Sequence, residues 1–144
     1  MRVSAKGEYA IKAMLDLALH DGAGLRPIQD IAGRQHIPQR YLEQVLLQLK
    51  RAGLLLSKRG SAGGYRLGRP ADQITVGAVL RAVEGGPTDP VRRPRPAGGA
   101  ATELAELWGA VAEAVAGVVD GLTLADLKRR AEERESGARP MYHI

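Results

Sequence analysis

The chain of 144 residues contains no cysteine, and this absence excludes several kinds of site. Without thiolates it has no disulfide, no cysteine-held zinc and no cysteine-held iron–sulfur centre. Phenylalanine is also absent and aromatic residues make up only 3%, so Leu, Val, Ile and Ala must build the core. Hydrophobic residues still reach 44%, which supports one ordinary domain, or a small domain with an appendage.

Long apolar runs and enzyme motifs are missing as well. No stretch of about 18 uninterrupted apolar residues occurs, so we expect no membrane span and no membrane partner. The start, Met-Arg-Val-Ser-Ala-Lys-Gly-Glu, lacks the apolar segment of a signal peptide, and we expect a cytoplasmic protein. His20, His36 and His143 show no metal-ligand spacing, and neither a Gly-x-Ser-x-Gly elbow nor a P-loop is present. We therefore expect neither an enzyme nor a cofactor.

Charge is distributed unevenly along the chain, although the net charge is only +5. Residues 1–70 have 12 Lys/Arg and 5 Asp/Glu, a net charge of +7, whereas residues 71–144 have 9 and 11, a net charge of −2. This asymmetry is typical of a nucleic-acid-binding half joined to a non-binding half. Ordinary solubility is the simpler alternative when charge is considered alone.

The most specific pattern lies in residues 38–69. Apolar spacing predicts an amphipathic helix over residues 38–52, stopped by Gly53, with Leu47 pointing away from its buried face. Strand candidates at 54–58 and 65–67 enclose a basic, glycine-rich turn, which predicts a hairpin. Further helices are expected from the cap Ser4 through Leu19, after Pro27, and over residues 75–84. The whole indicates a mainly α fold with a small β-hairpin wing, a winged helix-turn-helix.

The exposed side of this helix and the hairpin carry side chains suited to double-stranded DNA. Arginine pairs with guanine, glutamine with adenine, and glutamate accepts from cytosine, so Arg40, Glu43 and Gln44 are expected to contact bases. Lys58 and Arg59 flank the wing turn, where they can bind phosphate or enter the minor groove. For any one residue a mixed-charge surface helix is the simpler alternative, and only the combination favours DNA. The complete predicted DNA-binding set is Gln39, Arg40, Tyr41, Glu43, Gln44, Lys58 and Arg59, although packing suits Tyr41 better.

The second half of the chain predicts an assembly element. We expect a DNA-binding domain over 1–84, a Pro/Gly/Arg loop over 85–101, a dimerisation helix and a following helix over 102–136, and a tail over 137–144. The helix over residues 102–120 has a long apolar seam, which a second copy would cover, so we expect a homodimer. Packing of the seam on the chain's own first helix is the alternative. The seam consists of Leu104, Leu107, Trp108, Val111, Val115 and Val118.

Several segments together resemble the bacterial IscR/NsrR/CymR family of dimeric winged-helix transcription regulators. The likeness covers essentially the whole chain. It implies that residue 40, Glu43 and Gln44 contact DNA, that Arg59 serves the wing, and that the helix ending near Asp120 is the dimer helix. The segments are Met-Arg-Val-Ser-Ala-Lys-Gly-Glu-Tyr-Ala, Ile-Pro-Gln-Arg-Tyr-Leu-Glu-Gln, Gly63-Gly64-Tyr65-Arg66-Leu67-Gly68 and Thr123-Leu124-Ala125-Asp126-Leu127.

Many members of this family hold an iron–sulfur cluster through three cysteines after the fourth helix, and this chain has none. It is more similar to the cluster-free branch typified by the cysteine-metabolism repressor CymR, through Val83-Glu84-Gly85-Gly86-Pro87, Leu107-Trp108 and the Tyr-x-Ile ending. That branch implies a repressor controlled by cysteine synthase, an enzyme that captures a C-terminal isoleucine. The expected partner-binding residues are Tyr142, His143 and Ile144.

Two other functions stay open at the level of sequence. One is a regulator that binds a small effector directly between its helices. The other is a protein-interaction module whose winged helix binds no DNA and whose tail regulates a metabolic enzyme.

Overall fold

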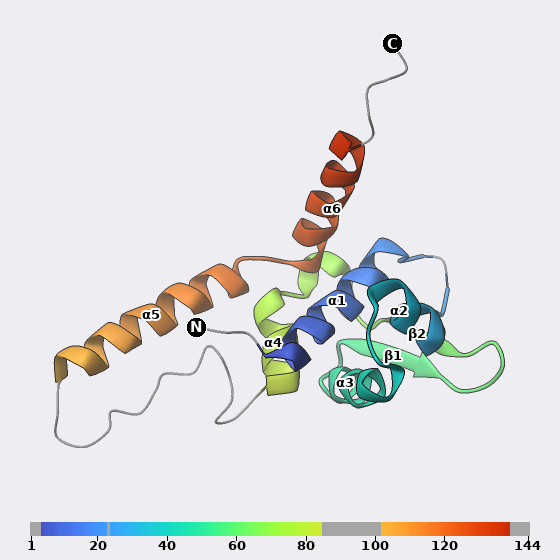
Figure 1. The fold of residues 1–144 in the computed structure, drawn as a ribbon, viewed down its shortest axis with the longest axis horizontal. Helices are drawn as coiled ribbons and strands as arrows, with labels where there is room; N and C mark the ends of the chain where they lie inside the picture. The colour runs from blue at the N-terminus through green and yellow to red at the C-terminus, as the bar shows by residue number, and fades with distance from the viewer. Residues whose placement is uncertain (1–3, 23, 85–101, 139–144) are drawn as a thin grey trace, which may run out of the picture.

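The computed structural model describes residues 4–22, 24–84 and 102–138 (Figure 1). A body of short helices and one hairpin confirms the mainly α fold with a small β-hairpin wing. No helix in the described ranges is both long enough and apolar enough to cross a membrane. The elements in chain order are α1 (Ala5–Leu19), α2 (Ile28–Gln35), α3 (Gln39–Arg51), β1 (Leu55–Lys58), β2 (Gly64–Leu67), the 3-10 helix η1 (Ala71–Gln73), α4 (Val76–Glu84), α5 (Thr102–Asp120) and α6 (Leu124–Ala138).

Capping residues explain where the helices begin and end. The Oγ of Ser4 accepts a hydrogen bond of 3.2 Å from a backbone N–H in the first turn of α1. After α3, Gly53 adopts a φ of 79°, the left-handed conformation that glycine tolerates best. The N–H groups of Gly53 and Leu54 then donate to carbonyls of the last turn, which would otherwise lack partners. The start of α1 and the end of α3 therefore lie where the sequence predicted them.

The wing is an antiparallel hairpin of β1 and β2, in which Leu55 lies opposite Leu67. A further pairing, which no sequence pattern indicated, joins it to the segment before α2. The backbone N–H and C=O of Arg26 exchange hydrogen bonds of 2.8 Å with those of Tyr65. Gly64 permits this approach, because a Cβ there would overlap the backbone of Arg26. The wing is therefore tied directly to the helix-turn-helix.

The core lies between α1, α3, α4 and the inner side of the wing. Helix α1 ends at Leu19 as predicted, but its buried face passes through Leu17 and leaves Leu19 36% exposed. Leu124 is fully buried in the same core, so the base of α6 packs with the N-terminal body. The largest fully buried apolar side chains include Met14, Ile31, Leu42, Leu46, Leu49, Ile74 and Leu124.

Helix α5 has the predicted bounds and extends away from the body (Figure 1). It packs against α4, and Ala112 is its one buried residue. Most of the seam is left in solvent by the described residues, rather than covered by α1. The four most exposed seam residues, at 49–62% of their surface, are Leu104, Leu107, Trp108 and Val118.

Candidate nucleic-acid interface

A short turn places α3 on the surface of the body. Residue His36 adopts φ 54° and ψ 46°, a left-handed conformation that ends α2. Ile37 is buried and donates its N–H to the carbonyl of Ala32 at 3.0 Å, which anchors the turn. Pro38, whose fixed φ suits a helix start, then leads into α3.

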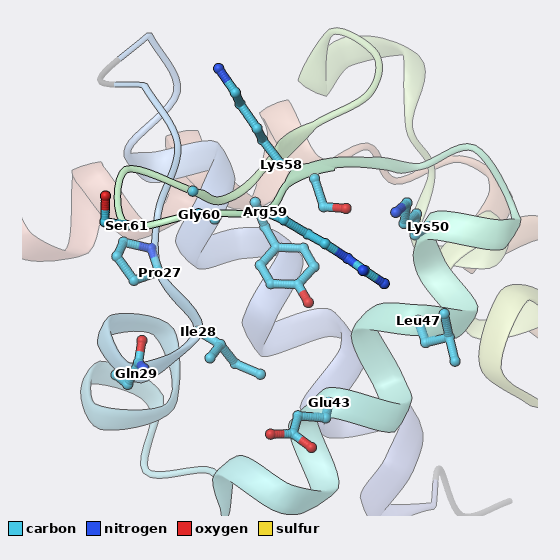
Figure 2. Close-up of a pocket in the computed structure, with 14 residues that line it drawn as sticks. Pro27, Ile28, Gln29, Glu43, Leu47, Lys50, Lys58, Arg59, Gly60 and Ser61 are labelled. Carbon is cyan, nitrogen blue, oxygen red and sulfur yellow. The ribbon is translucent and has the colours of Figure 1, made fainter.

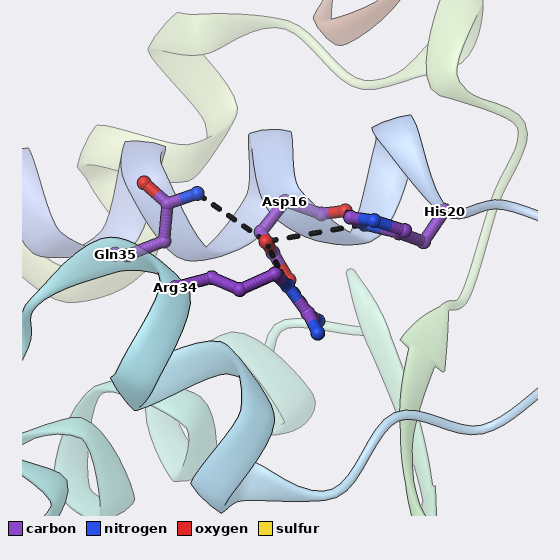
Figure 3. A network of polar contacts seen from close by, with 4 residues as sticks. All are labelled: Asp16, His20, Arg34 and Gln35. Carbon is purple, nitrogen blue, oxygen red and sulfur yellow. Dashed lines mark hydrogen bonds and ion pairs between the residues drawn. The ribbon is translucent and has the colours of Figure 1, made fainter.

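A buried ion pair fixes α2 against α1 (Figure 3). Asp16 of α1 is 1% exposed and accepts two hydrogen bonds of 2.8 Å from the Nε and Nη2 groups of Arg34. The Nε2 of Gln35 donates a third hydrogen bond at 3.3 Å. Since α3 follows α2 after only a short turn, this pair acts together with the buried face of α3 in positioning that helix.

The ionisation of Asp16 follows from these contacts. Burial alone raises the pKa of its carboxyl group. Hydrogen bonds from Arg34 and Gln35, together with the charges of Arg34 and His20, outweigh burial and hold the pKa below 3.8. In return, the hydrogen bond to Asp16 raises the pKa of Arg34. The pair is therefore charged at neutral pH and acts as a structural connection between two helices.

Helix α3 has one apolar and one polar face. Leu42, Val45, Leu46 and Leu49 point inward and are fully buried, as the spacing predicted. A helix with an exposed polar face of this kind fits the width of a DNA major groove. The exposed residues in its first turns are Gln39, Arg40, Tyr41, Glu43 and Gln44.

An open groove of about 700 Å³ lies between α3 and the wing (Figure 2). Glu43, Leu47 and Lys50 of α3 line one side, and the wing turn with Lys58 and Arg59 lines the other. Figure 2 shows Arg59 extending across the groove towards Leu47 and Lys50, whereas Lys58 extends away from α3. Three cationic side chains against one carboxylate make this lining attractive to an anionic polymer.

The predicted DNA-binding residues fall into two adjacent groups. The groove brings together Glu43, Lys58 and Arg59. Outside the groove, on the exposed start of α3, lie Gln39, Arg40, Tyr41 and Gln44.

Tyr41 makes an aromatic packing contact with α1. Its ring packs edge-on against the ring of Tyr9 in α1, with centroids 5.3 Å apart and an interplanar angle of 77°. The side chain remains 37% exposed. It therefore connects α3 to α1 while part of the ring stays in contact with solvent.

Some residues that line the groove were not predicted. Lys50 follows Glu43 by seven residues, so helical periodicity alone places both on one side of α3. Leu47, 45% exposed, had no expected partner, and its place is the groove wall. Ile28 and Gln29 reach the groove because the segment before α2 pairs with the wing. No local pattern in the sequence reports such a one-residue pairing.

Comparison by sequence finds a family and close relatives. The Rrf2 family, described as an iron-dependent transcriptional regulator, matches residues 3–130. The HTH-type transcriptional regulator IscR of Photobacterium profundum is 40% identical over 142 residues, which cover 96% of this chain and 82% of that protein. The IscR of Yersinia pestis is 42% identical over 130 residues, which cover 88% and 79% of the two chains.

The part of the chain that the structure describes offers no set of donor atoms for the iron in the family description. The chain has no cysteine, and thiolates are the usual ligands of an iron–sulfur cluster. Within residues 4–22, 24–84 and 102–138, no three His, Asp or Glu side chains lie close enough together to hold a metal ion.

Solved structures of regulators share the fold over most of the chain. The global cysteine regulator CymR of B. subtilis is 35% identical with a TM-score of 0.81, covering 90% of this chain and 98% of that one. The IscR of T. potens is 36% identical with a TM-score of 0.78, covering 93% and 90%. These relatives are transcriptional regulators and not enzymes. With its winged helix, its exposed α3 and these matches, the chain belongs to the Rrf2 family of DNA-binding transcriptional regulators.

Proposed function

We propose that this chain is a repressor that binds a palindromic DNA operator as a homodimer. The observation that carries the proposal is the polar face of α3 beside a basic groove and wing. In helix-turn-helix proteins the second helix enters the major groove. The wing then touches the next stretch of backbone or minor groove. The groove between α3 and the wing receives the sugar–phosphate strand that separates the two DNA grooves.

Each side chain takes a role that its chemistry allows. Arg40, Glu43 and Gln44 contact base edges, because they occupy the exposed first turns of α3. Leu47 packs against deoxyribose, which is the least polar part of the backbone. The remaining contacts to phosphate, sugar or the minor groove come from Gln39, Tyr41, Lys50, Lys58 and Arg59.

The division into parts follows from the same proposal. Residues 1–84 form the DNA-binding domain and residues 102–136 the dimerisation part, although the base of α6 shares the N-terminal core. The loop over 85–101 and most of the tail over 137–144 lie outside the described residues. A second copy of α5 is the proposed occupant of the exposed seam. Small exposed residues along α5 allow a close approach of two helices, and they include Ala110, Ala114 and Gly117.

Replacing Leu107 with glutamate tests the dimer. In the proposed dimer the charge would lie where the second copy of α5 covers the seam, so the variant should sediment as a folded monomer. Its operator affinity should fall by about 100-fold, since each protomer then binds its half-site alone. The matched control is Leu56→Glu, which alters another exposed leucine, 45% exposed, on the wing. That variant should stay dimeric. A Leu107→Glu protein that sediments like the wild type would refute the α5 interface.

Selection from a random DNA library tests the repressor proposal itself. The full chain should enrich a palindrome, and a gel-shift assay should show that this duplex binds far more tightly than a scrambled one. A palindrome upstream of its own operon is the expected natural site. Absence of any preferred sequence would instead favour the protein-interaction module.

We further propose that the regulator works without an iron–sulfur cluster, in the cytoplasm, on cysteine or sulfur metabolism. The lack of cysteine supports the first point, and the structural similarity to a regulator named for cysteine supports the last. Deletion of the gene should raise transcripts of sulfur-assimilation genes. Unchanged transcripts in sulfur-replete and sulfur-starved cells would contradict this assignment.

The interaction with cysteine synthase stays a prediction. Tyr142, His143 and Ile144 lie outside the described residues. A pull-down with purified cysteine synthase should retain the full chain but not a variant that lacks Ile144. Equal retention of both proteins, or of neither, would remove this partner.

A further inference from the structure

Among the described residues, helix α5 meets the body over the half that leads into α6, and its other end points away from the body (Figure 1). The corner between α5 and α6 lies against the start of α4 through two backbone hydrogen bonds. The N–H of Val76 donates to the carbonyl of Leu122 at 2.8 Å, and the N–H of Leu124 donates to that of Ile74 at 2.9 Å. These bonds fix the position of the corner. They leave the direction in which α5 departs to be set by other contacts.

An ion pair beside this corner constrains that direction. The Nη1 and Nη2 groups of Arg81, in α4, donate to the Oδ1 and Oδ2 atoms of Asp120 at 2.7 and 2.9 Å. Asp120 is the last residue of α5. A two-pronged arginine–carboxylate contact of this kind specifies orientation as well as distance. The hydrogen bonds and charge of Arg81 also lower the pKa of Asp120.

Gly77 provides a second observation about the same contact. A Cβ built on Gly77 would overlap the Oδ1 atom of Asp120, so the carboxylate lies directly against the backbone of α4. Gly77 has no left-handed conformation to explain its presence. The absent side chain is what leaves room for Asp120.

Stability alone is a poor explanation for the pair. The side chains of Arg81 and Asp120 are 40% and 43% exposed, and solvent screens ion pairs of this kind. The effect of the pair on the direction of α5 is larger than its effect on stability. Helix α5 has 19 residues and is therefore about 28 Å long, so a change of about 10° at the corner displaces its far end by about 5 Å. That displacement exceeds the rise of one base pair, about 3.4 Å.

We propose that Arg81 and Asp120 are positioning residues that set the angle between the DNA-binding body and α5, and thereby the half-site spacing that the dimer prefers. The inference rests on the proposed operator binding by a dimer joined through α5. In such a dimer, the Arg81–Asp120 pair of each protomer fixes the position of that protomer's α3, and the two pairs together set the distance between the two α3 helices.

The test compares operator spacing among variants of the full chain. The probe is the palindrome selected by the wild-type protein, with its centre shortened or lengthened by one and two base pairs. Asp120→Asn and Gly77→Ala should each reduce the preference for the best spacing by about fivefold. Because both changes disturb one contact, the double variant should lose no more than either single variant. Dimerisation and binding to scrambled DNA should be unchanged.

Matched controls separate orientation from general damage. Arg129→Gln breaks an exposed ion pair with Asp126 inside α6, and Gly137→Ala fills an open position in the same helix. Both controls should keep the wild-type spacing preference. A cysteine introduced at the exposed Arg51 of α3 gives one spin label per protomer in this cysteine-free chain. Distances between labels in the free dimer should be narrowly distributed in the wild type and broader in Asp120→Asn.

Three results would overturn the inference. The first is an unchanged spacing profile and label distance in Asp120→Asn. The second is an equal loss at every spacing together with weaker dimerisation, which indicates a merely structural role. The third is a wild-type protein that is monomeric or selects no palindrome, which defeats the proposed function and this inference with it.

Discussion

Gln44 is the residue whose substitution best reports base contacts. Its amide is exposed in α3, where it can form two hydrogen bonds with adenine, worth about 1–3 kcal/mol of discrimination. Gln44→Ala should therefore lower operator affinity by roughly 5- to 150-fold and leave binding to scrambled DNA nearly unchanged. Fluorescence anisotropy with both duplexes measures this. Gln73→Ala, at an exposed position in η1, is the control. Equal losses on both duplexes would remove Gln44 from the base contacts.

His36 offers a stability test in the turn of the helix-turn-helix. Its φ of 54° is unfavourable for any residue with a side chain, by about 1 kcal/mol. His36→Gly should raise the free energy of unfolding by about 0.5 kcal/mol, because the extra freedom of glycine in the unfolded chain offsets part of the gain. Urea denaturation measures the difference. His20→Gly, where φ is −110°, should be destabilising, and a similar loss in His36→Gly would contradict the strain argument.

Residues that face solvent from a single helix could be predicted from sequence, whereas contacts made across elements could not. The spacing of Leu42, Val45, Leu46 and Leu49 determines which way Glu43 and Gln44 face. The Tyr9–Tyr41 contact and the position of Leu47 depend instead on the angle between elements. Nothing in local spacing specifies that angle.

Among the elements, the connection of α1 to α2 is expected to depend on pH. Asp16 has a lower pKa in the folded protein than the value near 3.9 of an unfolded chain, so its ionised form stabilises the fold. This contribution is complete above about pH 4 and is lost as the pH falls through the folded pKa. Arg34→Gln should lower the free energy of unfolding at pH 7 by about 2 kcal/mol. That value is below the usual cost of breaking a buried pair, because Arg34 is 34% exposed.

Urea unfolding between pH 2.5 and 7 tests this dependence. The wild type should lose more stability below pH 4 than Asp16→Asn, in which the titrating carboxyl group is absent. Arg129→Gln, which breaks an exposed ion pair, should change stability little at any pH. Parallel pH curves for the wild type and Asp16→Asn would show that the carboxylate does not contribute.

Element boundaries were predictable because caps are local. Thr123 and Asp126 form a capping box that the Thr-x-x-Asp spacing indicates: Asp126 accepts from the N–H of Thr123 at 3.0 Å, and Thr123 Oγ1 accepts from that of Asp126 at 3.1 Å. The Asp16–Arg34 pair was not predictable, since an aspartate on an apolar helix face needs a partner 18 residues away. The pairing of the Arg26 segment with the wing was missed for the same reason.

At the scale of the whole molecule, the seam of α5 was predictable because a short chain has little surface to cover it. What the sequence could not specify is how α5 leaves the body, which depends on the corner with α4 and on Asp120. In the proposed dimer, this orientation sets the half-site spacing that the protein prefers.

The salt dependence of DNA affinity reports how many protomers contact the operator. Each phosphate neutralised by a cation contributes about 0.9 to the slope of log affinity against log salt. Lys50, Lys58 and Arg59 are the exposed cations assigned to the DNA backbone in the proposed interface, so a dimer using all three in each protomer would give a slope of about −5. Arg59→Ala should reduce the magnitude of the slope by about 2, because both wings lose a cation, whereas a monomer would lose about 1.

Titrations of the operator duplex between about 50 and 200 mM salt resolve this difference, since binding of this kind changes by orders of magnitude over that range. The control Arg130→Ala removes an exposed cation from α6, away from the groove, and should leave the slope unchanged. An unchanged slope in Arg59→Ala would remove the wing from the interface. A change near 1 would mean that only one wing touches DNA, and the symmetric arrangement on a palindrome would have to be abandoned.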